Sequence, residues 1–575
     1  MADAAPAAAD LDLASIREAR ALARLAHEAR PILAELSQEQ IDAIVDAMAA
    51  AVTPHAEALA RLAVEETGYG VVADKIQKNL FASEKVYRSI RPMKTVGVIR
   101  RDEGRRVIEI AEPFGVVAAV VPSTNPTSTT IYKILIAIKA RCPIVISPHP
   151  AAVRCISRTT EILHEAARRA GAPDGAISWM RSVTLEGTQE LMKHRDVAVI
   201  LATGGMGLVR AAYSSGKPAY GVGPGNAPAY IERTADVAKA VSDVTTGKTF
   251  DNGVLCSSEN SVVVDEAIAE EVRREFVRQH GYFLAPPEIE AVGKALVTPQ
   301  RLPNPALVGK AATAIAQQAG VTVPADTRVL LAELAGVGRE YPLSIEKLCP
   351  VLSFYVVKDW REGCERCKQI LRYGGMGHTM AIHSRNEAVI LEFGLKKPAF
   401  RIVVNTPTTH GAIGLTTGLD PALTLGCGGY GGNITSDNIT PMHLLNVKRL
   451  AYEVTPAGSK PADGFVGWPA VELPVLPPPP PAAPGVSGES LLRHIDQFFS
   501  SRGGVAAPAA APAAVPAGAV PLASKPVDFV CEDDVRQAIR NGQKILVGDR
   551  TIITPAARDL GEQYKVFTPV SWRPS

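Results

Sequence analysis

Short apolar runs that alternate with helical segments begin at residue 115. Residues 115–121, 144–146 and 197–201 have the composition of strands buried on both faces, and residues 127–140 have that of a helix between the first two. Strands of this kind, separated by helices, are typical of a mostly parallel sheet covered by helices. The pattern predicts an α/β fold, with a second α/β region over 231–430.

The residues before this region have a different pattern. Apolar residues at helical spacing predict helices from residue 13 to about 90, and residues 1–12 are expected to be disordered. Ser37, with Glu39 and Gln40 nearby, resembles a helix start with a capping box. Two β-type runs predict a hairpin over 95–111. Such a hairpin either pairs with a neighbouring subunit, which is the interpretation adopted here, or forms a local flap.

After Glu453 the composition predicts a C-terminal extension that is mostly disordered. Five consecutive prolines at 477–481, and the run 507–523 of almost only Ala, Pro, Val and Gly, are typical of linkers. Between them, the apolar residues of 487–503 fall on one face of a short helix. A helix this short is marginal alone, so it is expected to fold on a partner or back on its own chain. The expected divisions are a Pro-rich linker at 454–486, an amphipathic helix at 487–503, an Ala/Pro linker at 504–526 and a small module at 527–575.

Charge and cysteine content exclude several classes of partner. Lys plus Arg total 61 and Asp plus Glu total 59, so neither nucleic acid nor an anionic membrane is expected as a partner. No apolar run approaches the ~20 residues that cross a bilayer, and the start of the sequence lacks a secretory signal pattern. Eight cysteines in 575 residues fit a reducing cytosol better than a disulfide scaffold. The lone pair Cys364 and Cys367 is a weak metal or redox signal, so no metal is expected.

Cys256 lies in a polar, glycine-containing turn directly before the apolar run 261–265. This layout predicts a loop leading into a buried strand. Reactive groups often occupy loops on a rigid scaffold, and a thiolate is a strong nucleophile. Most cysteines, however, are small buried hydrophobic residues. Its own surroundings therefore leave Cys256 as either a nucleophile or a core side chain.

Four further segments place polar or bare backbone groups near expected strand ends. The first follows strand 115–121, at the end where open α/β sheets bind ligands. The second opens a helix, and its N–H groups either meet a phosphate or form a tight turn. The third is a glycine-rich loop that allows close approach, and the fourth is a carboxylate that could accept ribose hydroxyls or cap backbone groups. The segments are 122–126 with Thr124 and Asn125, 203–207 with Thr203, Gly204 and Gly205, 221–228 with Gly223 and Gly225, and Glu346.

Together with the Cys256 loop, these segments resemble the aldehyde dehydrogenase superfamily. They look most like its coenzyme-A-acylating branch of acetaldehyde and propionaldehyde dehydrogenases, of the type associated with bacterial microcompartments. The resemblance covers about residues 13–453 and depends on several motifs occurring together and in order. These motifs are Glu66-Thr67-Gly68-Tyr69-Gly70, Glu112-Pro113-Phe114-Gly115, Thr124-Asn125-Pro126-Thr127-Ser128-Thr129, Ser147-Pro148-His149-Pro150, the Cys256 loop and Gly377-His378-Thr379.

The resemblance implies an aldehyde dehydrogenase-like fold. A Rossmann-like cofactor-binding domain would span 13–230, and its hairpin at 95–111 would join subunits into a homodimer or homotetramer. A second α/β domain, carrying Cys256, would span 231–430 and hold the catalytic site. Residues 431–453 would return to the cofactor and oligomerisation region.

The resemblance also implies a reaction in two halves. Cys256 would attack an aldehyde, hydride would pass to a nicotinamide cofactor, and a thioester would remain on the sulfur. The oxyanion would be held by the Cys256 N–H and by a side chain of Thr124 or Asn125. Hydrolytic relatives carry an asparagine two residues after a proline. The same count from Pro122 reaches Thr124, whereas the asparagine of this sequence comes one place later, at Asn125. The choice between these two side chains therefore stays open.

The second half-reaction decides the product. Aligned on Pro228, the general-base glutamate of hydrolytic relatives is replaced by Val222, which cannot activate water. The thioester is then expected to wait for the thiol of coenzyme A. His378 either assists proton transfer at Cys256 or at that thiol, or is a structural histidine.

For the cofactor, the resemblance assigns Gly204 and Gly205 to the pyrophosphate turn and Glu346 to the nicotinamide ribose. Ser147 and His149 stand where hydrolytic relatives hold the adenine ribose with a lysine and a glutamate. Because no basic residue in this segment is placed for a 2′-phosphate, NAD is expected rather than NADP.

The C-terminal extension suggests a location. The amphipathic helix at 487–503 is similar to encapsulation peptides, which dock enzymes into bacterial microcompartments, so shell or cargo proteins are expected partners. We therefore expect an acylating dehydrogenase that converts propionaldehyde or acetaldehyde, with NAD and coenzyme A, inside a microcompartment in the cytoplasm. The alternatives are an acylating dehydrogenase for an anionic semialdehyde such as succinate semialdehyde or sulfoacetaldehyde, a hydrolytic dehydrogenase, and an assembly protein with an inactive catalytic domain.

Overall fold

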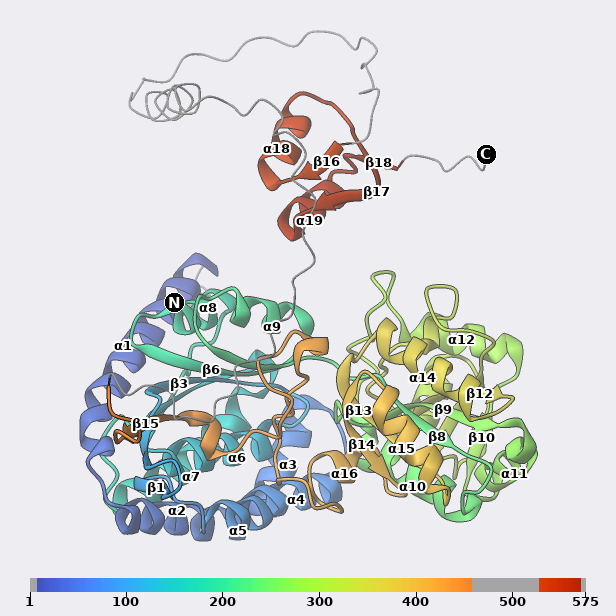
Figure 1. Cartoon of the computed structure of the whole chain (residues 1–575). Coiled ribbons are helices and arrows are strands. Elements are labelled where there is room, and N and C mark those ends of the chain that lie inside the picture. Colours follow the sequence, from blue (N-terminus) through green and yellow to red (C-terminus); the bar gives the residue numbers. More distant parts are fainter. Residues whose placement is uncertain (1–7, 458–526, 570–575) are drawn as a thin grey trace, which may run out of the picture. The chain divides into compact units, whose positions relative to one another are not determined.

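The computed structural model describes residues 8–457 and 527–569, which belong to two separate units. The first unit holds three sheets and the second holds one (Figure 1). The helix expected at 487–503 and the linker at 504–526 lie outside the described residues, as does the linker 454–486 beyond residue 457.

Helices come first in the chain. α1 begins at Ala8, so residues 8–12 are helical although disorder was expected up to residue 12. Alanine is the strongest helix former, and Asp10 in the first turn stabilises a helix N-terminus. α2 begins with the predicted capping box, because Ser37 Oγ accepts from the Gln40 N–H at 3.3 Å and Gln40 Oε1 accepts from the Ser37 N–H at 2.8 Å. These helices are α1 (Ala8–Ala34), α2 (Gln38–Val52), α3 (Ala56–Thr67), α4 (Val72–Leu80) and α5 (Tyr87–Ile90).

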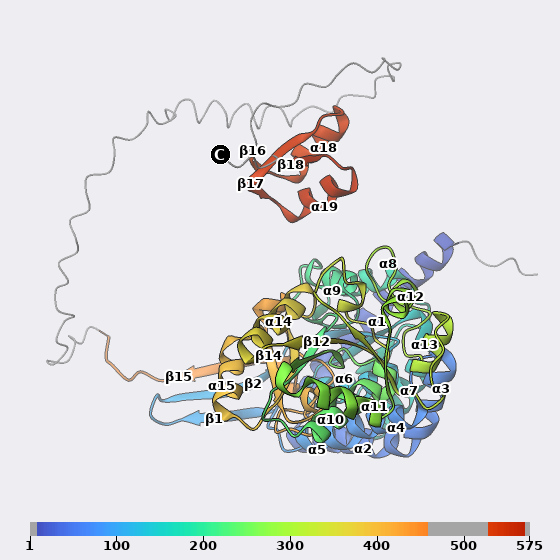
Figure 2. The ribbon, with the colours of Figure 1, turned by 90° about the vertical axis from the view of Figure 1, so that its right-hand side faces the viewer.

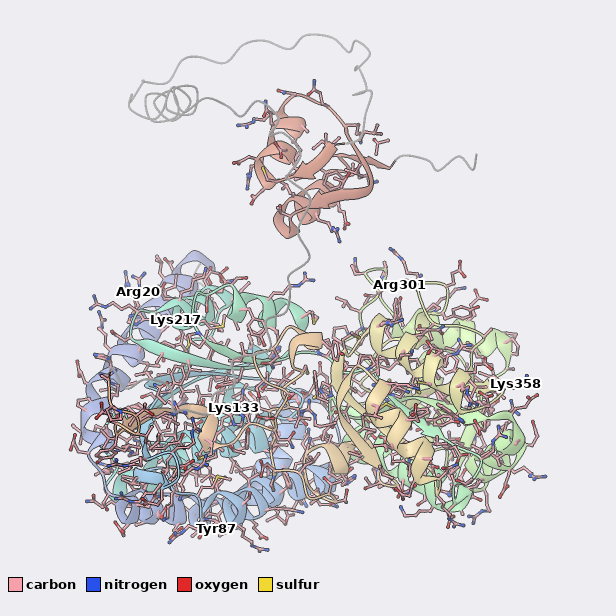
Figure 3. The ribbon with its side chains drawn as sticks, viewed as in Figure 1. Arg20, Tyr87, Lys133, Lys217, Arg301 and Lys358 are labelled. Carbon is pink, nitrogen blue, oxygen red and sulfur yellow. The ribbon has the colours of Figure 1, made fainter. Side chains whose placement is uncertain are left out.

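A five-stranded parallel sheet forms the first α/β region, as predicted. Its order is β5-β4-β3-β6-β7, so the wholly apolar and buried β3 is central. Lys133 is buried, and its Nζ donates to the carbonyls of Val120 in β3 and Leu201 in β6 at 2.7 and 2.9 Å (Figure 3). The elements are β3 (Val116–Val121), α6 (Pro126–Lys139), β4 (Ile144–Pro148), α7 (Val153–Arg169), β5 (Ile177–Trp179), α8 (Leu185–Lys193), β6 (Val197–Thr203), α9 (Met206–Tyr213) and β7 (Ala219–Val222).

The predicted hairpin is part of a three-stranded antiparallel sheet. β1 (Gly97–Asp102) pairs with β2 (Val107–Pro113), and β15 (Leu445–Ala451) adds to the other edge of β2. Figure 2 shows these three strands projecting from the rest of the first unit. The chain thus returns to the hairpin at the end of this unit.

A seven-stranded parallel sheet forms the second α/β region, in the order β10-β11-β12-β9-β8-β13-β14. The expected domain boundary at 230 falls inside β8, because β8 already pairs with β9 and β13. Central β9 begins three residues after Cys256, as Glu259 is its first residue. The strands are β8 (Ala227–Ile231), β9 (Glu259–Asp265), β10 (Gly281–Phe283), β11 (Val329–Glu333), β12 (Val351–Val357), β13 (Gly377–His383) and β14 (Ala399–Val404). The helices are α10 (Val237–Thr249), α11 (Ala269–Arg278), α12 (Pro286–Leu296), α13 (Ala312–Gln318), α14 (Trp360–Tyr373), α15 (Glu387–Lys396) and α16 (Thr408–Ala412).

The connection between the two large sheets positions the site. β7 ends at Val222 and β8 begins at Ala227, so only residues 223–226 join the sheets. This short link leads from the carboxyl end of β7 to the amino end of β8, and the two α/β regions lie side by side (Figure 1).

The second unit has a small βαβαβ fold. Its three parallel strands lie in the order β16-β17-β18 over a core of Val530, Val535, Ala538, Ala557 and Val566. The elements are β16 (Val527–Val530), α18 (Glu532–Arg540), β17 (Ile545–Ile553), α19 (Pro555–Gln563) and β18 (Phe567–Pro569). Over the two described ranges, no helix has the length and apolar character needed to cross a membrane.

Candidate active site

A cavity of about 430 Å³ lies between the facing edges of the two large sheets. The loops after β3, β4, β6 and β7 line it from the first sheet, and the segments before β9 and β12 line it from the second. It contains most of the residues that the sequence singled out. These are Thr124, Asn125, His149, Thr203, Gly204, Gly205, Gly223, Cys256 and Glu346.

Three predicted residues lie behind the cavity wall instead. Ser147 is buried, and its hydroxyl pairs with Thr188 Oγ1 at 2.8 Å. Gly225 packs against the Cys256 backbone so tightly that a Cβ there would lie 2.0 Å from the Cys256 carbonyl oxygen. His378 is fully buried beside Gly225, with Nδ1 3.0 Å from Thr379 Oγ1 and Nε2 without a protein partner. Burial lowers the pKa of His378 to about 3, so its imidazole is neutral and a weak base.

The loop before Cys256 is held in an uncommon backbone conformation. Asp251, Asn252 and Gly253 all have positive φ, at 50°, 52° and 72°. Asp251 Oδ1 accepts from the Val71 N–H at 2.7 Å, and Asn252 Nδ2 donates to the Gly309 carbonyl at 2.9 Å. These bonds from other parts of the chain hold the strained turn and so position the thiol.

The Cys256 thiol is protonated at neutral pH in this arrangement. Burial raises its pKa to about 12, and the nearby Glu346 and Cys427 act in the same direction. Arg401, 3% exposed, and the Cys256 backbone N–H act in the opposite direction. Since the thiolate is the reactive form, a ligand bound in the cavity must favour loss of this proton before the sulfur can attack.

Glu346 supplies the only carboxyl group among the described residues that line the cavity. Its Oε1 accepts from the Gly225 N–H at 2.8 Å. Burial raises the pKa of Glu346 to about 8, against the effects of that N–H and of Lys248 and Lys347. The carboxyl is therefore mostly neutral at pH 7 and anchored to backbone. Val222 also lines the cavity, at the position where the resemblance expects a general base in hydrolytic enzymes.

The loop after β6 fits a dinucleotide. The Thr203 hydroxyl is buried without a protein partner, which leaves a polar atom for a ligand. Gly205 precedes α9, and a Cβ added there would meet nothing within 4 Å. Open space at a helix N-terminus, with free N–H groups, suits a pyrophosphate.

Sequence reasoning missed several residues at the site. Val183, Thr184 and Leu185, before and at the start of α8, line the cavity although no motif marks them. Lys75 and Lys78 on α4 are buried and contact the loops of Thr124 and Cys256. Their spacing is the only sequence signal, and lysines at such spacing usually lie on an exposed helix face. In the described ranges, no three His, Cys, Asp or Glu side chains are grouped so as to hold a metal ion.

Comparison with known proteins gives consistent matches. A model of the aldehyde dehydrogenase family matches residues 6–282. The chain is 43% identical over 442 residues to the bifunctional aldehyde-alcohol dehydrogenase AdhE of Escherichia coli (strain K12), covering 76% of this chain and 50% of that protein. It is 39% identical over 439 residues to the succinate-semialdehyde dehydrogenase (acetylating) of Clostridium kluyveri, covering 76% of this chain and 96% of that protein. The chain thus spans about half the length of AdhE and almost all of the second relative.

Solved structures are similar to most of this chain. An acetylating aldehyde dehydrogenase from Geobacillus thermoglucosidasius has 52% sequence identity and a TM-score of 0.77, covering 78% of this chain and 100% of that chain. A propionaldehyde dehydrogenase from the Clostridium phytofermentans fucose utilisation bacterial microcompartment has 29% identity and a TM-score of 0.68, covering 76% of this chain and 98% of that chain.

Proposed function

The chain belongs to the aldehyde dehydrogenase family, and from this premise we propose that it is a CoA-acylating enzyme that oxidises a short aliphatic aldehyde with NAD⁺. One observation carries the proposal. Cys256 lies in a cavity that has Val222 in place of a general base, and the only carboxyl group among the described lining residues is anchored to the Gly225 N–H. A thioester formed there would lack a partner to activate water, so a second thiol becomes the acceptor.

In the first half-reaction, Cys256 binds the aldehyde carbon and the resulting oxyanion accepts hydrogen bonds from preorganised donors. Gly204 and Gly205 would hold the pyrophosphate of NAD⁺, whose nicotinamide ring would supply the hydride acceptor. We assign the nicotinamide ribose to Glu346, and its position in the lining of the same cavity supports this. The absence of lysine and arginine among the described lining residues supports NAD⁺ over NADP⁺, since a 2′-phosphate has no cation there.

The second half-reaction passes the acyl group from Cys256 to coenzyme A. We assign the proton released in this exchange to Nε2 of neutral His378, because this nitrogen has no protein partner. Its low pKa makes this nitrogen a weak acceptor. The alternative is that His378 only supports the backbone beside Gly225.

Omission of coenzyme A tests the proposal most directly. Enzyme mixed with NAD⁺ and propanal is expected to release one equivalent of NADH per subunit and then stop, because the thioester persists. Addition of coenzyme A should restore steady turnover. NADH absorbance follows the reaction, and mass spectrometry should identify propionyl-CoA. Steady NADH release with free propionate, in the absence of coenzyme A, would show a hydrolytic enzyme.

A second candidate is an acylating dehydrogenase for an anionic semialdehyde. The similarity to the succinate-semialdehyde dehydrogenase of Clostridium kluyveri favours it. Against it, a substrate carboxylate would find no lysine or arginine among the described lining residues. The CoA-dependent assay, repeated with succinate semialdehyde, separates the two, and a higher kcat/KM for the anion than for propanal would favour the second.

We also propose that the enzyme is cargo of a bacterial microcompartment. The similarity to the Clostridium phytofermentans enzyme supports this, together with the amphipathic pattern of 487–503. Deletion of 487–503 is expected to leave kcat of the purified enzyme intact while abolishing co-purification with shell proteins. A deletion of 508–516 in the Ala/Pro linker is the control, and it should preserve co-purification. If the enzyme lacking 487–503 still co-purified, this segment would not be the docking element.

A further inference from the structure

Lys347 is buried within the segment 346–348, which brings Glu346 to the cavity and is called the cavity segment below. Its neighbours in the chain, Glu346 and Leu348, both line the cavity, whereas Lys347 is 1% exposed and is not part of the lining. A lysine is buried as completely as this only where acceptors converge on its ammonium group. The partners of Lys347 Nζ therefore show what holds the cavity segment in place.

The Nζ atom of this lysine bonds to four acceptors from three parts of the second α/β region. Two of them are the carbonyls of Leu343 and Ile345, at 2.6 and 3.0 Å, in the turn that precedes the cavity segment. The other two lie on the neighbouring strands β9 and β12, where Nζ donates to the Asn260 carbonyl at 3.0 Å and to Ser353 Oγ at 3.3 Å. One nitrogen atom thus ties this turn to two strands of the sheet.

The geometry of these contacts favours a charged lysine. Three of the partners are carbonyls, and the Ser353 hydroxyl gives its own hydrogen to the Leu343 carbonyl at 2.6 Å, so all four act as acceptors toward Nζ. A neutral amine would have to turn its lone pair toward one of them, whereas an ammonium group offers three hydrogens. Burial and the nearby Lys248 lower the pKa of Lys347, and the ring of acceptors opposes them. Among the described residues no carboxylate bonds to Nζ, so dipoles hold the charge.

The position of the Glu346 carboxyl depends on this anchor. The backbone N–H of Lys347 donates to Asn260 Oδ1 at 3.1 Å, and Glu346 Oε1 accepts from the Gly225 N–H at 2.8 Å. Leu348, the next residue, has a φ of 52°, which is uncommon for a residue with a side chain. The cavity segment is thus held in a strained shape by contacts with other segments. Without the bonds of Nζ, the turn that leads into this segment would relax and the carboxyl of Glu346 would shift.

We propose that Lys347 is a positioning residue of the cofactor site, whose ammonium group fixes the turn that presents the Glu346 carboxyl to the nicotinamide ribose. The inference rests on the proposed function, because it takes Glu346 as the group that holds this ribose. Lys347 is buried outside the cavity lining, so it acts on the cofactor only through Glu346. Its loss should therefore weaken NAD⁺ binding and misalign the hydride acceptor with the carbon on Cys256.

Lys347→Met tests the anchor, because methionine fills much of the same space and has no hydrogen to donate. The dissociation constant of NAD⁺, measured by calorimetric titration without aldehyde, is expected to rise about tenfold, the effect of one lost hydrogen bond in a closed site. At saturating NAD⁺ and without coenzyme A, the rate constant of the NADH burst should fall about 10²-fold, since a misplacement of about 1 Å has an effect of this size. A folded Lys347→Met protein that bound NAD⁺ as tightly as the wild type would overturn the proposal.

A double-mutant cycle tests whether Lys347 acts through Glu346. In a Glu346→Ala background, Lys347→Met should change the dissociation constant of NAD⁺ by less than about twofold, because the carboxyl that it positions is gone. An equal effect in both backgrounds would reduce Lys347 to a structural role. Lys139→Met is the matched control, since Lys139 is also fully buried, donates to the Arg91 carbonyl at 2.8 Å and lies outside the cavity lining. It should bind NAD⁺ like the wild type, and a loss as large as that of Lys347→Met would overturn the proposal.

Ser353→Ala provides the same test if thermal unfolding shows that Lys347→Met is not folded. It removes one acceptor of Nζ and the donor to the Leu343 carbonyl, and it leaves the ammonium group in place. NAD⁺ binding is expected to weaken about threefold in the wild type and to stay unchanged in the Glu346→Ala background. Wild-type affinity in Ser353→Ala would overturn the proposal. If the wild type itself did not bind NAD⁺, the proposed function would fail, and this outcome is distinct from any result of the cycle.

Discussion

Cys256→Ala is expected to lower NADH formation by about 10⁴-fold or more, in the presence or absence of coenzyme A. The physical reason is that Cys256 is the only thiol among the described residues that line the cavity, so no other sulfur can carry the acyl group. The burst measured without coenzyme A should vanish together with steady turnover. Mass spectrometry of the protein after exposure to NAD⁺ and propanal should show no acyl adduct.

Cys155→Ala is the matched control for this variant. Cys155 is a buried thiol on α7 whose Sγ contacts the Ala152 carbonyl, away from the cavity lining. Its loss should leave the burst intact. A Cys256→Ala protein that retained the burst would remove Cys256 from the reaction. If the wild-type enzyme also failed to turn over every aldehyde tested, the result would instead favour an assembly protein with an inactive catalytic domain.

Val222→Glu is expected to convert the enzyme toward hydrolysis. Without coenzyme A, steady NADH release should appear and exceed that of the wild type by about 10²–10⁴-fold, the range that a positioned general base contributes. Val222 ends β7 and lines the same cavity as Cys256, so a carboxylate there faces the space in which the thioester forms. The product should include free acid, identified by NMR or mass spectrometry, and the yield of acyl-CoA should fall.

Val222→Gln is the control, because glutamine has the same size as the glutamate of Val222→Glu and no basic oxygen. It should show the burst without steady turnover. If the wild type and Val222→Gln both released acid steadily without coenzyme A, a group other than residue 222 would be activating water. Glu346→Gln would then identify that group, since Glu346 supplies the only carboxyl among the described lining residues and has a pKa near 8.

The α/β fold could be predicted because its signals are local. The apolar run of β3 requires burial on both faces, and a sheet between layers of helices provides that burial. The capping box at Ser37 is likewise set by neighbouring residues, and it is present. In the structure, the start of α1 and the boundary at β8 lie several residues away from the expected positions. The reason is that helix ends and strand pairing depend on contacts with other segments, which a single segment does not reveal.

The sequence by itself singled out Cys256, Val222 and the glycine turn after β6, since each is a matter of residue type within one short segment. The tertiary structure decided which side chains meet. It placed Ser147 and His378 behind the cavity wall and brought Lys75 and Lys78, which are distant in sequence, to Asp251 and Asn125. The physical reason is that a lysine is buried only where acceptors from other segments converge on it. Convergence of that kind arises from the packing of α4 against two loops, and no local pattern encodes it.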